Sequence, residues 1–151
     1  MFKQILIVCI GNICRSPVAE KLLRQKLSRH GIAVSSAGLG AVNGSQMDET
    51  AIEVLRAHGV DDTAHVARQL DEPMIHTADL LLVMEKDHLR AIGRRAPQAR
   101  GKTFLLGRWL DDLEIPDPYR QPRMAFEHAY AQIERATEHW RVRLQSTQGG
   151  L

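Results

Sequence analysis

The sequence predicts a single α/β domain over residues 1–151, in which a four-stranded parallel sheet carries helices on both faces. Apolar runs typical of buried strands alternate along the chain with segments of helical periodicity. The 151 residues suffice for one core, and 44% hydrophobic with 25% charged residues is ordinary for a globular protein. No repeat, linker or low-complexity segment divides the chain into further units.

Each element has a local signal. Buried parallel strands are short, continuous apolar runs, whereas helices place apolar residues three and four positions apart, between a capping residue and a glycine or proline. In the first half, these signals predict a strand over 4–9, a helix with Ser16 as N-cap and Pro17 at its first position that stops at Gly31, a strand over 32–35, a loop over 37–40 and a helix from Asp48 or Thr50 to Gly59. In the second half, they predict a short strand over 65–67, a strand over 78–84, a helix over 87–92 stopped by Gly93, a strand over 103–106, a long loop over 107–122, a helix from 123 to about 145 and a frayed tail over 148–151. Strands and helices in this order predict a flavodoxin-like topology.

The joint between the first strand and the first helix reads Cys9-Ile-Gly-Asn-Ile-Cys-Arg15-Ser16-Pro17. A loop that leads from a strand into a helix N-terminus binds anions, because several backbone N–H groups there lack partners. A thiol at its start and a guanidinium at its end predict nucleophilic attack on a tetrahedral oxyanion, and Gly11 is expected to allow close backbone approach. The alternative is a buried cysteine that acts as a small hydrophobe. The helix start and Arg15 favour the thiolate, and therefore the catalytic role for Cys9.

Two charged residues extend this hypothesis. Arg15 places a positive charge at a helix start, where the helix dipole opposes it unless an anion compensates, and a guanidinium binds phosphate through two parallel hydrogen bonds. Asp117 lies between two prolines, which restrict the backbone and could hold a carboxyl over a cleft, although such an aspartate is often only a turn residue. A carboxylic acid there would protonate a departing phenoxide.

Composition argues against several other classes of protein. A net charge of +2 is too small to favour nucleic acid as the main partner, and no apolar run approaches the length of a membrane span, so we expect no membrane insertion and a cytoplasmic location. The only two cysteines lie in one loop and no zinc motif occurs, which predicts neither a structural disulfide nor a metal. A solvated helix end is favoured over a docking patch for one basic group, Arg90, Arg94, Arg95, Arg100 and Lys102.

Four segments together resemble the low-molecular-weight protein tyrosine phosphatases, over about residues 3–144: Cys9 to Pro17, His65 to Gln69, Met84-Glu85 and Asp117 to Tyr119. The segments 39–41, 100–102 and 114–120 are further similar to the bacterial branch that is associated with exopolysaccharide tyrosine autokinases. The resemblance implies hydrolysis of phosphotyrosine through a cysteinyl-phosphate, without metal or organic cofactor.

The resemblance also implies a role for each matching residue. Cys9 would be the nucleophile, Arg15 the phosphate clamp and Asp117 the general acid and then base. The phosphate would be cradled by the backbone of Ile10, Gly11, Asn12, Ile13, Cys14 and Arg15. The loop would be supported by Ser16, which would hydrogen-bond the Cys9 sulfur, and by Asn12, Ser36 and His65. Leu39 and Tyr119 would form the substrate pocket, since the aromatic residue that animal members carry within about 39–47 is absent here.

The implied partner is a tyrosine-phosphorylated protein, in this branch a tyrosine autokinase, and phosphate or other oxyanions are expected to inhibit. Cys14 is either a small packing residue or a redox partner that captures an oxidised Cys9 as a disulfide. Two alternatives to the phosphatase remain: an arsenate reductase on the same loop, which would need further cysteines, and a phosphate-binding module without turnover.

Overall fold

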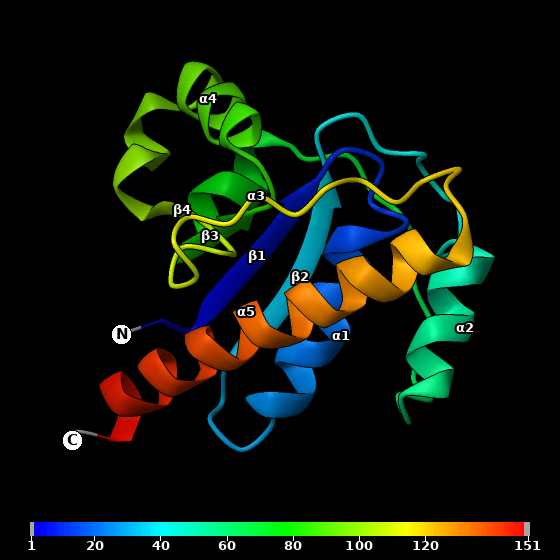
Figure 1. The fold of residues 1–151 in the computed structure, drawn as a ribbon. Coiled ribbons are helices and arrows are strands. Elements are labelled where there is room, and N and C mark those ends of the chain that lie inside the picture. The colour runs from blue at the N-terminus through cyan, green and yellow to red at the C-terminus, as the bar shows by residue number, and fades with distance from the viewer. Residues whose placement is uncertain (1, 150–151) are drawn as a thin grey trace.

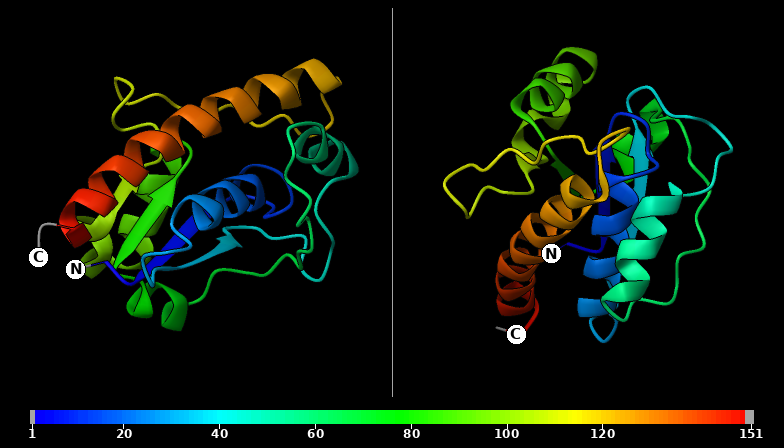
Figure 2. Two further views of the ribbon diagram at one scale, coloured as in Figure 1. Left: turned by 90° about the horizontal axis from the view of Figure 1, so that it is seen from below. Right: turned by 45° about the vertical axis from the view of Figure 1, so that its right-hand side comes forward.

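The computed structural model describes residues 2–149 and shows a parallel sheet between two layers of helices (Figures 1 and 2). The strands are β1 (Gln4–Cys9), β2 (Ala33–Gly38), β3 (Leu80–Val83) and β4 (Thr103–Leu105). They pair in the order β2-β1-β3-β4, and every pair is parallel. The predicted α/β domain with a four-stranded, flavodoxin-like sheet is therefore confirmed. Folds of this kind bind ligands beyond the carboxyl ends of the strands.

The helices are α1 (Arg15–Lys26), α2 (Glu49–Ala57), α3 (Glu72–Thr77), α4 (Lys86–Arg95), the 3-10 helix η1 (Pro97–Lys102) and α5 (Arg123–Gly149). Helices α1, α2 and α5 cover one face of the sheet, while α3 and α4 cover the other (Figure 2). The core accordingly has two halves, because side chains alternate between the faces of a strand. In β1, Ile5 and Ile7 pack on the first side, and Leu6 and Val8 on the second.

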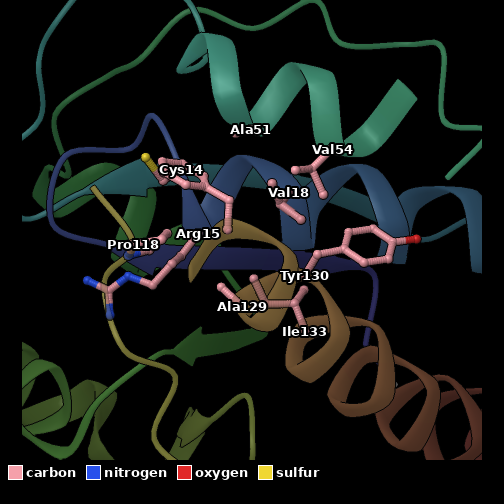
Figure 3. A pocket seen from close by; sticks show the side chains of 10 residues that line it. Cys14, Arg15, Val18, Ala51, Val54, Pro118, Ala129, Tyr130 and Ile133 are labelled. Carbon is pink, nitrogen blue, oxygen red and sulfur yellow. The ribbon is translucent and has the colours of Figure 1, made fainter. Parts of the chain in front are cut away.

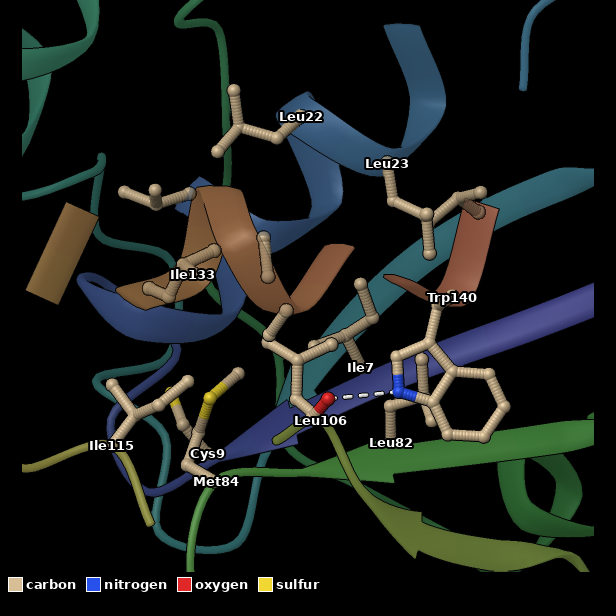
Figure 4. Packing of buried hydrophobic residues seen from close by; sticks show 14 of the residues in the cluster. Ile7, Cys9, Leu22, Leu23, Leu82, Met84, Leu106, Ile115, Ile133 and Trp140 are labelled. Atoms are coloured by element: carbon tan, nitrogen blue, oxygen red, sulfur yellow. Dashed lines mark hydrogen bonds between the residues drawn. The ribbon is translucent and has the colours of Figure 1, made fainter. Parts of the chain in front are cut away.

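Cys9 lies where the first half of the core reaches the carboxyl edge of the sheet. Met84 and Ile115 pack close to it in Figure 4, and both are fully buried. Further along the same core, the buried indole of Trp140 donates a hydrogen bond to the Leu106 carbonyl at 2.8 Å, which satisfies its one polar atom. The end of β1 is therefore held in a well-packed frame.

The start of α1 differs from the prediction. Cys14, rather than Ser16, is the N-cap, and its side chain makes no capping hydrogen bond. Ser16 lies inside the first turn, where its hydroxyl bonds to the Cys9 sulfur and to Asn12. Pro17 is tolerated there because the first four N–H groups of a helix have no intrahelical partner.

Two other expectations are wrong. Gly93 does not stop α4, which continues to Arg95 and ends before Pro97. Residues 65–67 are not a strand, since Ala67 exchanges hydrogen bonds with Gly44 and Ser45 of the loop after β2 instead of joining the sheet.

Helices α3 and η1 were not predicted. Each has only six residues, which is too short for a helical period to show in the sequence. Helix α5 runs to Gly149, past its predicted end, so the first part of the predicted frayed tail is helical. Residues 150 and 151 of that tail lie outside the described part of the chain.

Candidate active site

The segment after β2 binds the carbonyl groups of the loop that follows β1. Four N–H groups donate to four carbonyls of the loop at 2.9–3.0 Å: Leu39 to Cys9, Gly40 to Ile10, Val42 to Gly11 and Asp48 to Ile13. Within the described chain, no N–H group of residues 10–14 donates a hydrogen bond in turn. A row of backbone N–H groups next to a helix start binds an anion. The loop thus has the donors that its sequence predicts.

Close approach between β2 and this loop depends on Gly38. A Cβ atom at this position would lie 2.3 Å from the Ile10 carbonyl oxygen. Gly11 needs no such freedom, since its φ is not positive and a Cβ there would meet Ile13 and Val42 at ordinary contact distances. The left-handed residue of the loop is Asn12, with φ 59°. The strained turn is therefore made by a buried asparagine, which needs partners for its side chain.

The Asn12 amide has those partners. Its Nδ2 donates to Ser16 Oγ (2.8 Å) and Ser36 Oγ (3.0 Å), and its Oδ1 accepts from the Arg68 N–H (2.9 Å). The Asn12 carbonyl lies 2.7 Å from His65 Nε2. All four residues predicted to support the loop meet here. Because Ser16 accepts from Asn12, its own proton is available to the Cys9 sulfur 2.9 Å away, where it would stabilise a thiolate.

The support extends to two residues that the sequence reasoning missed. Ser36 donates to Glu20 Oε1 at 2.6 Å, and Glu20 Oε2 accepts from Arg24, which also donates to the Val34 carbonyl. Glu20 is only 6% exposed, so its charge needs these partners. The sequence did contain a pattern that could have predicted this support: Ser16, Glu20 and Arg24 are spaced by four residues and therefore share one face of α1.

Arg15 is 2% exposed and held from one side. Its Nη1 donates to Glu85 Oε2 (2.5 Å) and to the Ile115 carbonyl (2.7 Å). Its Nη2 is 3.8 Å from Asp117 Oδ2, too long for a hydrogen bond, and neither Nη2 nor Nε donates one within the described chain. The free edge of the guanidinium can therefore form two parallel hydrogen bonds to an oxyanion. Glu85 was part of a matched motif, but no role had been predicted for it.

His88 lies behind the Arg15–Glu85 pair. Its Nε2 is 3.6 Å from Glu85 Oε2, and its buried Nδ1 has no partner. Burial, and next the positive charge of Arg15, lower the pKa of His88, so the imidazole is neutral near neutral pH. Because a neutral His88 does not form an ion pair with Glu85, the Glu85 carboxylate pairs with Arg15.

The loop, Arg15 and Asp117 surround a cavity of about 220 Å³, which is lined by Cys9, Ile10, Gly11, Ile13, Cys14, Arg15, Gly40, Val42, Asp117 and Tyr119. Its rim is apolar and exposed, with Ile10 at 42%, Val42 at 46% and Tyr119 at 40%. Asp117 is about half exposed, and its Oδ1 accepts from the Tyr119 N–H at 3.1 Å. Leu39 does not line this cavity and packs against the second half of the core, so its predicted place in the pocket is wrong. Val42 supplies the aliphatic wall instead.

A second, much smaller cavity lies behind the loop, between α1, α2 and α5 (Figure 3). Its volume of about 10 Å³ is at the limit for one water molecule, and Val18, Val54 and Ile133 make its wall apolar. The Arg15 guanidinium points away from these side chains in Figure 3. This space is a packing gap and not a ligand site.

Cys14 is buried between the two cavities, and both cysteines are free thiols. Burial, and next the carboxylates of Asp48 and Asp117, raise the pKa of Cys14 well above its usual range. Cys14 is therefore a neutral thiol in this site.

Two further findings concern the described residues only. No three of their histidine, cysteine, aspartate or glutamate side chains are grouped so that they could hold a metal ion. Nor is any helix over 2–149 both long and apolar enough to cross a membrane.

A thiol, a clamped guanidinium and an exposed carboxyl around an anion-sized cradle are the parts of a cysteine-dependent phosphatase. The chain belongs to the low molecular weight phosphotyrosine protein phosphatase family, whose model matches residues 4–149. It is 47% identical over 143 residues to the low molecular weight protein-tyrosine-phosphatase Etp of Escherichia coli K12, with 95% of each chain covered. The chain is thus an enzyme of the low molecular weight protein-tyrosine-phosphatase class, and the arsenate reductase alternative is not favoured.

Solved structures agree with this assignment. The tyrosine phosphatase Wzb from Escherichia coli K30, in complex with sulphate, has a TM-score of 0.91 at 46% identity, with 95% of this chain and 99% of that chain covered. The YwlE arginine phosphatase from Geobacillus stearothermophilus has the same TM-score at 36% identity, with 97% of this chain and 95% of that chain covered. The fold therefore carries more than one phosphatase specificity, and the choice between them depends on the pocket.

Proposed function

We propose that this enzyme hydrolyses phosphotyrosine in proteins through a cysteinyl-phosphate on Cys9, without metal or organic cofactor. The observation that carries the proposal is that two groups of hydrogen-bond donors without partners, the loop N–H groups and the free edge of the Arg15 guanidinium, belong to the same site. Four loop residues whose N–H groups make no hydrogen bond within the described chain line one cavity together with Arg15 and Cys9: Ile10, Gly11, Ile13 and Cys14. Such donors stabilise the charge that develops on a phosphoryl group in transfer.

The reaction follows from this geometry in two steps. The Cys9 thiolate, stabilised by the Ser16 hydroxyl, attacks phosphorus while Asp117 protonates the departing phenoxide. Asp117, now ionised, then takes a proton from the water that attacks the cysteinyl-phosphate, and phosphate is released. Arg15 and the loop N–H groups bind the phosphoryl oxygens throughout both steps. Free phosphate and other oxyanions, which fit the same donors, should inhibit.

The pocket rim favours a phenyl ring over a guanidinium group. Ile10, Val42 and Tyr119 present apolar surface at the mouth, and of the described residues that line the cavity only Asp117 is acidic. A phosphotyrosine ring can stack on Tyr119, whereas a phosphoarginine guanidinium would need hydrogen-bond acceptors there. Phosphoserine is too short to reach Cys9 while filling the space beside Tyr119.

The deciding experiment compares phosphotyrosine, phosphoserine and phosphoarginine in one peptide sequence, with a chelator present. Phosphate release should be fastest by far from phosphotyrosine and should not depend on the chelator. Faster phosphate release from phosphoarginine would contradict the proposal and identify phosphoarginine as the substrate. Binding of all three peptides without phosphate release would show that the protein is a phosphate-binding module and not an enzyme.

The physiological substrate that we propose is a tyrosine autokinase that controls exopolysaccharide or capsule production. The support is the resemblance of the segments 39–41, 100–102 and 114–120 to that bacterial branch. Incubation with a phosphorylated autokinase tail tests the partner, since failure to dephosphorylate it would contradict this part of the proposal alone.

Replacement of Asp117 by asparagine should lower kcat about 10²–10³-fold on phenolic substrates with poor leaving groups. Esters with activated leaving groups need less protonation and should lose less. Equal losses on both kinds of substrate would contradict the role of Asp117 as an acid.

We further propose that Cys14 protects the nucleophile. Peroxide converts the Cys9 thiolate to a sulfenic acid, and the Cys14 thiol then displaces water to form a disulfide that thiols can reduce. The replacement Cys14→Ser should retain most activity but recover little with dithiothreitol after peroxide treatment. Full recovery in this variant would leave Cys14 with a packing role only.

A further inference from the structure

Positive charge is concentrated in one part of the chain. Residues 86–102, which form α4 and η1, include six basic side chains and one carboxylate, for a net charge of +5, whereas the whole chain carries +2. The two helices stand together on one side of the molecule, away from α1 and α2 (Figure 1). Such a segregation of charge attracts anionic partners to this side.

Three of these six basic side chains border a groove of about 440 Å³ between α4 and the start of β4, which is lined by Leu89, Arg90, Gly93, Arg94, Arg100 and Thr103. Gly93 allows Arg100 to lie across α4, because a Cβ there would be 3.0 Å from Arg100 Nε. The glycine that the sequence analysis interpreted as the end of the helix therefore has a packing role inside it.

The basic side chains of this region differ in whether they already have partners. Arg90 pairs with Asp87 at 2.6 Å and Arg95 with Glu72 at 3.4 Å, while Lys102 donates to carbonyls at the end of α3. Arg94 and Arg100 are exposed and have no hydrogen bond or ion pair within the described chain. Two guanidinium groups without partners thus border one groove, and an anion there could bind both.

The groove lies within reach of the active site along α4. The helix starts directly after Glu85, which holds Arg15, and its first N–H donates to Glu114 in the segment that leads to Asp117. At 1.5 Å per residue, the stretch from Leu89 to Arg94 lies about 6–14 Å along the helix from Glu85. An extended peptide, at about 3.3 Å per residue, needs about four residues to reach the Arg94 end of this stretch, so a spacing of about four to six residues reaches the groove.

We propose that this groove binds a second anionic group of the phosphotyrosine substrate, either a carboxylate cluster or another phosphate, about four to six residues from the phosphotyrosine. The inference rests on the proposed function, which it extends from the reacting residue to its sequence context. Arg94 and Arg100 would hold the second group and would not take part in the chemistry.

The test uses peptides with one phosphotyrosine and either neutral flanks, three glutamates placed four to six residues away on either side, or one phosphoserine at the same spacing. The double replacement Arg94→Gln with Arg100→Gln should raise KM for the anionic peptides about tenfold and leave kcat unchanged. KM for the neutral peptide and for p-nitrophenyl phosphate should stay the same. The glutamate and phosphoserine arms distinguish the two kinds of anion.

A matched control replaces two exposed arginines outside the groove, Arg29→Gln with Arg135→Gln, which removes the same charge. An equal rise in KM in this control, or an equal KM for neutral and anionic peptides in the native enzyme, would overturn the groove proposal. Hydrolysis of p-nitrophenyl phosphate without hydrolysis of any phosphotyrosine peptide would instead contradict the proposed function. The two failures are therefore distinguishable.

Discussion

The replacement Cys9→Ser should abolish turnover of p-nitrophenyl phosphate and of phosphotyrosine peptides, with a loss of at least about 10³-fold in kcat. A serine hydroxyl at this place remains protonated and has no base beside it, since the Ser16 hydroxyl accepts from Asn12 and is left to donate toward residue 9. Oxyanion binding should survive, because the loop N–H groups and Arg15 are untouched. Phosphate should therefore still raise the melting temperature of the variant.

Cys14→Ser is the matched control for this experiment. It makes the same chemical change five residues away in the same buried loop, and it should keep most of the activity. Residual turnover by Cys9→Ser above a thousandth of that of the native enzyme would contradict the assignment of the nucleophile. An equal loss in both variants would show that any change in the loop disables it.

The predictable part of the fold follows from strong periodic signals. The apolar runs that form β1 and β3 are buried on both faces, and such strands are visible in a sequence without any tertiary information. Helix boundaries were less predictable, since they depend on contacts that the local sequence does not contain. Gly93 lies inside α4, where it leaves room for Arg100, and Ser16 lies inside α1, where its hydroxyl bonds to the Cys9 sulfur.

The residues of the site likewise fall into those that the sequence predicted and those that it did not. Cys9, Arg15 and Asp117 could be named because a nucleophile, a clamp and an acid have distinctive residue types, and a known family carries them in this pattern. Leu39 was misplaced because the path of the loop after β2 decides which aliphatic side chain faces the cavity. Glu20 and His88 were missed because their roles depend on burial, which requires partners for the charge of Glu20 and lowers the pKa of His88.

Arg15→Lys should be as damaging as the loss of the nucleophile, although it conserves charge. The native guanidinium does two things at once, since Nη1 is fixed by Glu85 and Ile115 while Nε and Nη2 remain free for substrate. A lysine ammonium is a single point of charge, so it can pair with Glu85 or with the phosphoryl group but cannot offer a fork to the latter. We expect kcat/KM to fall about 10³–10⁵-fold, the range known for arginines that stabilise phosphoryl transfer.

The matched control for this prediction is Arg24→Lys, which changes another arginine that bonds to a carboxylate and a backbone carbonyl but lies outside the cavity. It should alter kcat/KM by no more than a few fold. The melting temperatures of both variants separate lost chemistry from lost folding, because a fall in activity with an unchanged transition can only come from the site. Near-normal kcat in Arg15→Lys would mean that the charge at this position is sufficient, and that the backbone N–H groups of the loop, rather than the two-pronged clamp, stabilise the transferring phosphoryl group.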